Sequence, residues 1–93
     1  MRVLIVGAGI MGLSAAWALT KRGHETILLE QGASIPNPRA ASGDWHRIIR
    51  EAYGSAGNYA LAMDEAFDAW DELWQDTGSI DYSVTGILAL SRE

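Results

Sequence analysis

Three glycines near the amino terminus have the spacing that a phosphate-binding turn requires. Gly7, Gly9 and Gly12 form a G-x-G-x-x-G pattern directly after the apolar run 3–6. Glycine lets the backbone turn tightly and lets a phosphate approach main-chain N–H groups that no Cβ shields. Glu30 follows Gly12 by eighteen residues, close to the spacing of an acidic side chain that accepts a hydrogen bond from a ribose 2′-hydroxyl. The pattern predicts a dinucleotide site.

Glu30 also bears on which dinucleotide would bind. A 2′-phosphate would place a second anion beside this carboxylate, and the repulsion argues against such a ligand. The alternative is that Glu30 merely ends a strand in solvent.

Arg47 and Arg50 are the other side chains whose type points to chemistry. A planar guanidinium binds a carboxylate through two hydrogen bonds, which lysine cannot do. The alternative is that both arginines form solvent-screened surface ion pairs. His46 titrates near neutral pH in principle, but a lone histidine is more often structural. We expect a turn near residues 42–44 and an extended piece near 47–50.

The glycine turn needs a strand before it and a helix after it. We predict a strand at Arg2–Val6, a helix at about Ile10–Arg22 and a second strand at Thr26–Leu29 that leads into Glu30. Gly12 and Ala16 are four residues apart, so two small residues share the helix face that lies close on the sheet. Two parallel strands with one crossover helix cannot cover both faces of a sheet.

The remainder of the chain predicts a loop, a helix and a strand segment. Residues 31–43 are rich in turn formers, and Gly57–Thr77 has the clearest helical periodicity. One face of this helix is acidic and expected to be solvated. The tail Ile80–Ser91 suits a strand or hairpin with a turn near Thr85-Gly86. The apolar face of the helix is expected to be core: Tyr59, Met63, Ala66, Phe67, Trp70, Leu73 and Trp74.

Composition excludes several classes of function. The chain has 93 residues, enough for one small domain, and it has no cysteine, so it has no disulfide, thiolate metal site or thiol nucleophile. We predict no metal site. The net charge of −5 combines a basic first half with an acidic second half. An acidic chain is a poor nucleic-acid binder, so no nucleic-acid partner is expected.

The uncharged run from Val3 to Thr20, which is flanked by basic residues, could also be a signal peptide or membrane anchor. Its glycines at the dinucleotide spacing argue against this alternative. We therefore expect a cytoplasmic protein with no membrane partner.

The sequence resembles a known family. Val3–Glu30 matches the extended FAD-binding pattern, and residues 42–54 (SGDWHRIIREAYG) look like the second signature of the D-amino-acid-oxidase-like FAD-dependent oxidoreductases. Within that family the chain is most similar to the monomeric sarcosine oxidase and N-methyltryptophan oxidase branch. The resemblance covers nearly all 93 residues. It implies an α/β fold with a Rossmann-like FAD/NAD(P)-binding βαβ start, followed by a long amphipathic helix and a C-terminal strand or hairpin.

The resemblance also implies how the chain is organised. Residues 1–93 are expected to be the N-terminal part of an FAD-binding domain, incomplete relative to the family and inactive alone. Within it, 1–30 is the βαβ ADP-binding unit, 31–56 the flavin-proximal loop, 57–77 the helix and 80–91 the strand segment.

The implied activity is oxidation of a small-molecule amine or N-methyl amino acid, with hydride transfer from the carbon beside nitrogen to FAD and reoxidation by dioxygen. Arg47 would lie near the isoalloxazine ring, and Arg50 would pair with the substrate carboxylate; these two are the implied catalytic residues. The implied cofactor-binding residues are Gly7, Ala8, Gly9, Ile10, Met11, Gly12, Glu30, Gln31, Ser42, Gly43 and Arg47.

Two other functions remain open from the residues. The glycine turn with Glu30 suits an NAD-dependent dehydrogenase equally well, although that function leaves the Arg47–Gly54 run unexplained. The chain could also be a truncated, non-catalytic module that binds a nucleotide weakly or pairs with a partner through its strand edges.

Overall fold

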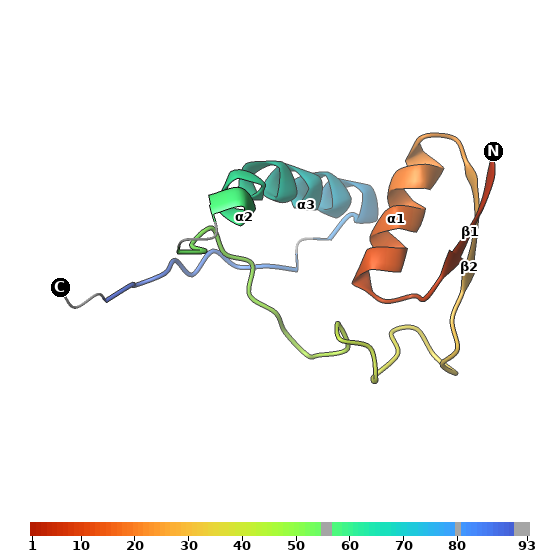
Figure 1. Ribbon diagram of the computed structural model, residues 1–93, viewed down its shortest axis with the longest axis horizontal. Coiled ribbons are helices and arrows are strands. Elements are labelled where there is room, and N and C mark those ends of the chain that lie inside the picture. The colour runs from red at the N-terminus through yellow and green to blue at the C-terminus, as the bar shows by residue number, and fades with distance from the viewer. Residues whose placement is uncertain (55–56, 80, 91–93) are drawn as a thin grey trace. The chain divides into compact units, whose positions relative to one another are not determined.

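The structure, a computed structural model, describes residues 1–54, 57–79 and 81–90. The chain divides into two compact units, Met1–Ile48 and Ile49–Glu93. The first unit holds two strands and one helix, and the second holds two helices (Figure 1).

The first unit is a parallel strand–helix–strand arrangement. β1 spans Arg2–Val6, α1 spans Ile10–Lys21 and β2 spans Glu25–Leu29. The strands are parallel and in register, with Arg2 opposite Glu25 at one end and Val6 opposite Leu29 at the other. The predicted βαβ start is confirmed, with element ends that agree within one residue.

One face of the two-stranded sheet is covered by α1. A Cβ added to Gly12 would lie 3.5 Å from Cγ2 of Ile5, so the small-residue face of the helix rests on this face of the sheet. At the other end of α1, Oγ1 of Thr20 lies 3.1 Å from Oγ1 of Thr26 on β2. The close approach that Gly12 predicted is therefore present.

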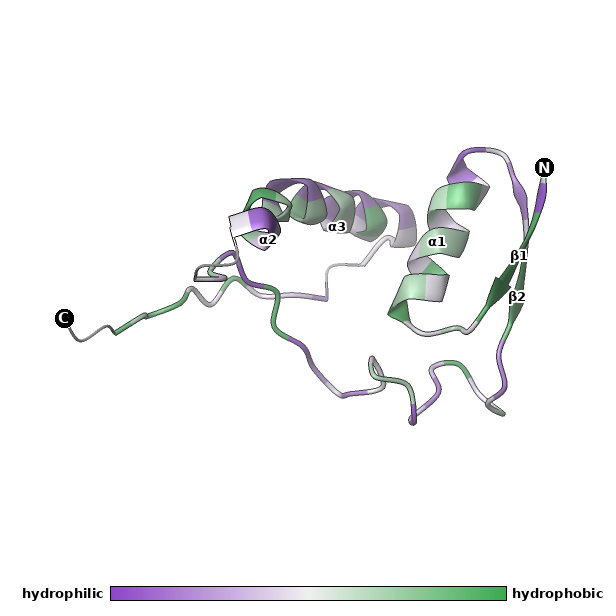
Figure 2. Ribbon diagram, in the orientation of Figure 1, coloured by the Kyte–Doolittle hydropathy of each residue, from purple (hydrophilic) through white to green (hydrophobic). Residues whose placement is uncertain are grey.

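The opposite face of the sheet is apolar and exposed. Side chains alternate between the two faces along a strand, and the half-exposed or exposed residues on this face are Leu4, Val6, Ile27 and Leu29. They lie opposite one another as two in-register pairs, Leu4 with Ile27 and Val6 with Leu29. Figure 2 shows the hydrophobic colour that runs along both strands. The prediction that one helix leaves a sheet face uncovered is confirmed for the described residues.

The connection after β2 is irregular but contains defined turns. The amide of Ala40 donates to the carbonyl of Asn37, and the amide of Gly43 donates to the carbonyl of Ala40. The second of these bonds closes a turn over residues 40–43, which overlaps the turn predicted near residues 42–44, and the first closes another turn just before it. Residues 46–50 form neither helix nor strand.

The second unit contains two helices where one was predicted. α2 spans Gly57–Leu61 and α3 spans Met63–Thr77, so the expectation of a single helix over 57–77 is wrong at Ala62. The amide of Ala62 donates to the carbonyl of Tyr59, a tighter i−3 bond that interrupts the α-helical pattern. Tyr59 leaves the apolar stripe and instead stacks on Tyr53, with ring centroids 5.6 Å apart.

The rest of the amphipathic pattern is as predicted. Met63 is buried, and the later apolar members of the stripe are half-buried, whereas the acidic residues on the other face are exposed. Figure 2 shows both hydropathy classes along α3. The helix ends at Gly78, whose left-handed backbone (φ +73°) lets its amide donate to the carbonyl of Trp74. The predicted end of the helix is confirmed.

The tail does not form the predicted strand. Residues 81–90 are neither strand nor helix, and the predicted ends Ile80 and Ser91 lie outside the described residues. A strand needs a neighbouring strand to complete its hydrogen bonds, and the described part of the second unit contains none. At the expected turn, Gly86 has a positive φ of 72°.

Candidate nucleotide-binding site

The glycine turn is a short, tight connection between the end of β1 and the start of α1. The amide of Gly7 donates to the carbonyl of Leu29 at 2.7 Å, which ties the turn to the end of β2. Gly7 has φ +99°, a conformation that favours glycine. A Cβ on Gly12 would lie 1.8 Å from the carbonyl oxygen of Gly7. The turn can close only because position 12 lacks a side chain.

The amino terminus of α1 presents backbone donors at this turn. The first N–H groups of a helix have no partner within the helix, and the helix dipole favours an anion there. Gly9 is the N-cap residue, and glycine has no side chain that could accept a hydrogen bond from the first helical amides. Instead the hydroxyl oxygen of Ser42 accepts from the amide of Ile10 at 3.1 Å. Among the described residues, none accepts a hydrogen bond from the backbone amide of Met11 or of Gly12. These two amides are therefore suited to donate to a phosphate oxygen.

Glu30 connects the end of β2 to the glycine turn. Its Oε2 accepts from the amide of Ala8 at 2.8 Å. Its Oε1 accepts from the amide of Gly32 and from the side-chain amide of Asn37, both at 2.8 Å. These donors, with the Ala8 amide acting most strongly and Asn37 next, lower the pKa of Glu30 from 4.5 to about 2. Glu30 is therefore an ionised carboxylate that is hydrogen-bonded beside the glycine turn.

Asn37 is the functional candidate that the sequence prediction missed. It lies in the run 31–43, which is rich in turn formers, and a turn signal of this kind does not reveal a partner seven residues away. Asn37 also lines a depression of about 450 Å³ formed by residues 31–34 and 37–39. This depression includes Gln31, one of the predicted cofactor-binding residues.

The two predicted arginines lie in different units. The guanidinium of Arg47 is 2.6 Å from Oδ2 of Asp44, an exposed ion pair in the first unit. Arg50 belongs to the second unit, where its guanidinium lies 5.1 Å from the centre of the Tyr53 ring. Both arginines are exposed. The structure thus brings together Gly7–Gly12, Glu30 and Ser42 within the first unit, and Arg50 belongs to the second.

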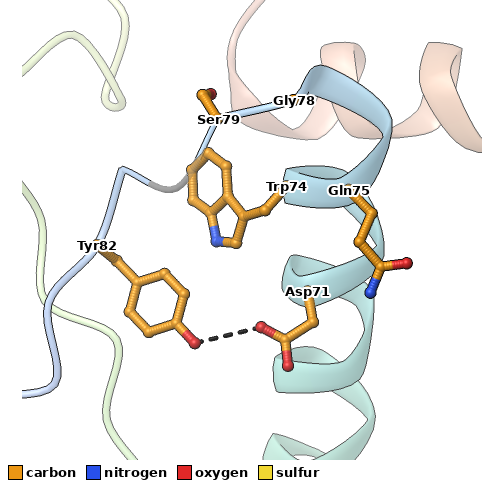
Figure 3. A pocket seen from close by; sticks show the side chains of 6 residues that line it. All are labelled: Asp71, Trp74, Gln75, Gly78, Ser79 and Tyr82. Atoms are coloured by element: carbon orange, nitrogen blue, oxygen red, sulfur yellow. Dashed lines mark hydrogen bonds between the residues drawn. The ribbon is translucent and has the colours of Figure 1, made fainter.

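A separate cavity of about 370 Å³ lies within the second unit. Trp74 stacks between Trp70 and Tyr82, with centroid distances of 5.3 and 6.2 Å. Figure 3 shows the Tyr82 hydroxyl, which donates to Oδ1 of Asp71 at 3.2 Å. This hydrogen bond, and secondly the Asp71 charge, raise the pKa of Tyr82. The contacts tie the start of the tail to α3.

The glycine turn has the features that an adenine dinucleotide requires. The amino terminus of α1 supplies backbone donors for a pyrophosphate, and the Gly12 contact leaves no room for a side chain at the turn. Glu30 supplies an ionised acceptor for a ribose hydroxyl. The residues present therefore fit the ADP half of FAD. Within the described ranges, no helix is both long and apolar enough to cross a membrane.

Comparison with known proteins gives one family. Residues 2–93 match the family model described as FAD dependent oxidoreductase. Monomeric sarcosine oxidase from Arthrobacter sp. (strain TE1826) is 36% identical over 89 residues, which cover 92% of this chain and 22% of that protein. Peroxisomal sarcosine oxidase from Homo sapiens is 36% identical over 87 residues, covering 94% of this chain and 22% of that protein.

A shorter match involves an amino acid oxidase. The L-amino acid oxidase from Cerastes cerastes is 44% identical over 66 residues, which cover 54% of this chain and 13% of that protein. No solved structure matches the chain. The chain spans about a fifth of the length of the sarcosine oxidases that it matches. With the family model matched over residues 2–93, this chain belongs to the FAD dependent oxidoreductase family.

Proposed function

We propose that the chain forms the N-terminal part of the FAD-binding domain of an amine or N-methyl amino acid oxidase. The observation that carries the proposal is the convergence of the glycine turn, the amino terminus of α1 and the Glu30 carboxylate. In this proposal residues 1–30 bind ADP, 31–56 approach the flavin, and the two helices within 57–77 form a helical layer. The similarity to sarcosine oxidases supports the amine substrate.

The cofactor-binding roles follow from the geometry of the turn. Residues 7–12 hold the pyrophosphate through backbone N–H groups, and Glu30 accepts a hydrogen bond from the adenosine ribose. Ser42 supports the turn through the Ile10 amide, and its neighbour Gly43 and the pocket residue Gln31 extend the same surface.

The two arginines act on the substrate side of the proposed site. A bound FAD would supply the electron acceptor for oxidation of the carbon beside the amine nitrogen, with dioxygen as the final oxidant. Arg50 binds the substrate carboxylate through a bidentate contact. Arg47 stabilises negative charge near the isoalloxazine. For this role its ion pair with Asp44 must break, and the free-energy cost is small because the pair is exposed to solvent.

Cofactor titration tests the nucleotide part of the proposal. We expect FAD to quench tryptophan fluorescence of the 93-residue chain at lower concentration than NAD. Glu30→Gln should weaken FAD binding by about tenfold, the effect of one hydrogen bond to a charged group. Glu25→Gln is the matched control, because Glu25 pairs with Arg2 on the surface and should bind FAD as the wild type does. Equal quenching by NAD and FAD, or equal affinity of the two variants, contradicts the assignment.

The substrate part is tested in the protein that contains this chain. We expect peroxide production from N-methyl amino acids, and a higher KM for them in Arg50→Lys with a smaller change in kcat. Arg22→Lys, at the end of α1, serves as the control. An unchanged KM in Arg50→Lys would remove Arg50 from the substrate site.

A further inference from the structure

The Glu30 carboxylate has most of its acceptor capacity already in use. An ionised carboxylate offers about four lone-pair positions. Oε1 accepts from Gly32 and from Asn37, which fills that oxygen. Oε2 accepts from the Ala8 amide, which acts most strongly on the carboxylate, and the Gln31 amide interacts with the carboxylate more weakly. The two oxygens of this carboxylate are therefore not equivalent.

Asn37 is held at Oε1 by the loop around it. Its side-chain oxygen accepts from the amide of Arg39 at 2.9 Å, which directs its NH₂ group toward Glu30. A Cβ on Gly32 would lie 2.5 Å from Nδ2 of Asn37, so the chain can pass here only without a side chain. Asn37 itself is half-buried. Both groups of the Asn37 amide are therefore engaged, and the side chain has one orientation.

We propose that Asn37 is a positioning residue for Glu30, which occupies Oε1 so that only Oε2 is offered to the ribose. This inference rests on the proposed nucleotide function and adds to it the number and place of the ribose contacts. A single hydroxyl donates to Oε2, on the side of the carboxylate that faces the Ala8 amide and the glycine turn. A bidentate contact of both ribose hydroxyls to the carboxylate is excluded while Asn37 holds Oε1.

Asn37→Asp is the most direct variant. It keeps the volume of the side chain and an acceptor for the Arg39 amide, but it replaces the donor to Glu30 by a carboxylate oxygen. Asn58→Asp is the matched control, since it makes the same charge change at an exposed residue of α2. Asn37→Ala removes the same donor without adding charge, and it replaces Asn37→Asp in the binding measurements if that variant does not fold.

Three ligands separate positioning from general loss of structure. We measure affinities of ADP, 2′-deoxy-ADP and inorganic pyrophosphate for the 93-residue chain by calorimetry. In the wild type, ADP should bind about tenfold tighter than 2′-deoxy-ADP, as one charge-assisted hydrogen bond predicts. In Asn37→Ala this ratio should fall to about twofold, while pyrophosphate affinity changes less than about threefold. Asn58→Asp should keep the wild-type ratio.

The outcomes are distinct. If all three ligands weaken equally in the Asn37 variants, or if the ADP ratio is unchanged, Asn37 does not position Glu30. If the wild type binds neither ADP nor pyrophosphate, the proposed function fails, and the Glu30 titration by NMR decides the Asn37 contact alone. A Glu30 pKa that rises in Asn37→Ala supports the contact, and one equal to the wild-type pKa overturns it.

Discussion

Each of the two units is stabilised internally by a different kind of interaction. In the first unit, hydrogen bonds join positions far apart in the sequence: Gly7 to Leu29, Ala8 to Glu30 and Ile10 to Ser42. In the second unit, the helices make their own local bonds, and tertiary contact comes from stacked rings such as Trp74 with Tyr82. The first unit is organised around a backbone turn, and the second around one stripe of side chains.

This difference determines which substitutions destabilise each unit. A backbone turn with no free space tolerates no added atoms, whereas a half-buried stripe loses stability in proportion to the apolar surface removed.

Gly12→Ala should destabilise the first unit by about 3 kcal/mol, because the new Cβ would meet the Gly7 carbonyl oxygen. Hydrogen exchange of the α1 and β1 amides should report the loss, and α3 should be unaffected. Gly57→Ala is the control, since a Cβ there meets nothing within 4 Å. Equal protection of α1 in the two variants would mean that the turn is not tightly closed.

Met63→Ala should destabilise the second unit and leave the first unit unaffected. Met63 is a buried apolar side chain of α3, and its truncation should cost about 2 kcal/mol. The measurement is hydrogen exchange of α3 amides, with β1 and β2 as the internal reference. Leu61→Ala, at a residue 81% exposed, should cost less than about 0.5 kcal/mol. A similar loss in both variants would argue against the burial of Met63.

Acid should weaken the first unit through Glu30. The pKa of Glu30 is about 2 in the folded chain and 4.5 in its ordinary state, so its contribution is complete above pH 4.5 and is lost as pH falls toward 2. The urea midpoint of the first unit should therefore drop more between pH 5 and about pH 2.5 in the wild type than in Glu30→Gln. Glu25→Gln should keep the wild-type slope, and a Glu30→Gln slope equal to it would contradict this role.

Asp71→Asn should produce the smallest change, in the second unit. The Asp71 carboxylate raises the pKa of Tyr82 through a hydrogen bond and through its charge, so the variant should lower that pKa. The stability cost should be small because both groups are exposed and solvent screens their interaction. NMR titration of the Tyr82 ring gives the measurement, and Asp64→Asn, two turns earlier on α3, is the control. A Tyr82 pKa that is the same in both variants would contradict the contact.

Much of the first unit could be predicted from its sequence. Turn chemistry and hydrophobic periodicity are local signals, and they gave the limits of β1, α1 and β2 within one residue. Glycine spacing, together with an acidic residue at the end of the second strand, predicts the dinucleotide turn and the role of Glu30. The second unit was less predictable: the stripe of α3 was identified, but the break at Ala62 depends on a single i−3 hydrogen bond. The tail has strand-forming residues, yet residues 81–90 form no strand because strand formation depends on a partner.

The amino-acid sequence by itself determined the family resemblance, the βαβ start and the residue types at the candidate site, because each is encoded in neighbouring residues. Only the tertiary structure decided which side chains meet. It placed Ser42 on the amino terminus of α1, joined Glu30 to the Ala8 amide and brought Asn37 to the other oxygen of that carboxylate. Such contacts depend on the path of an irregular loop, and no periodicity in the sequence specifies that path.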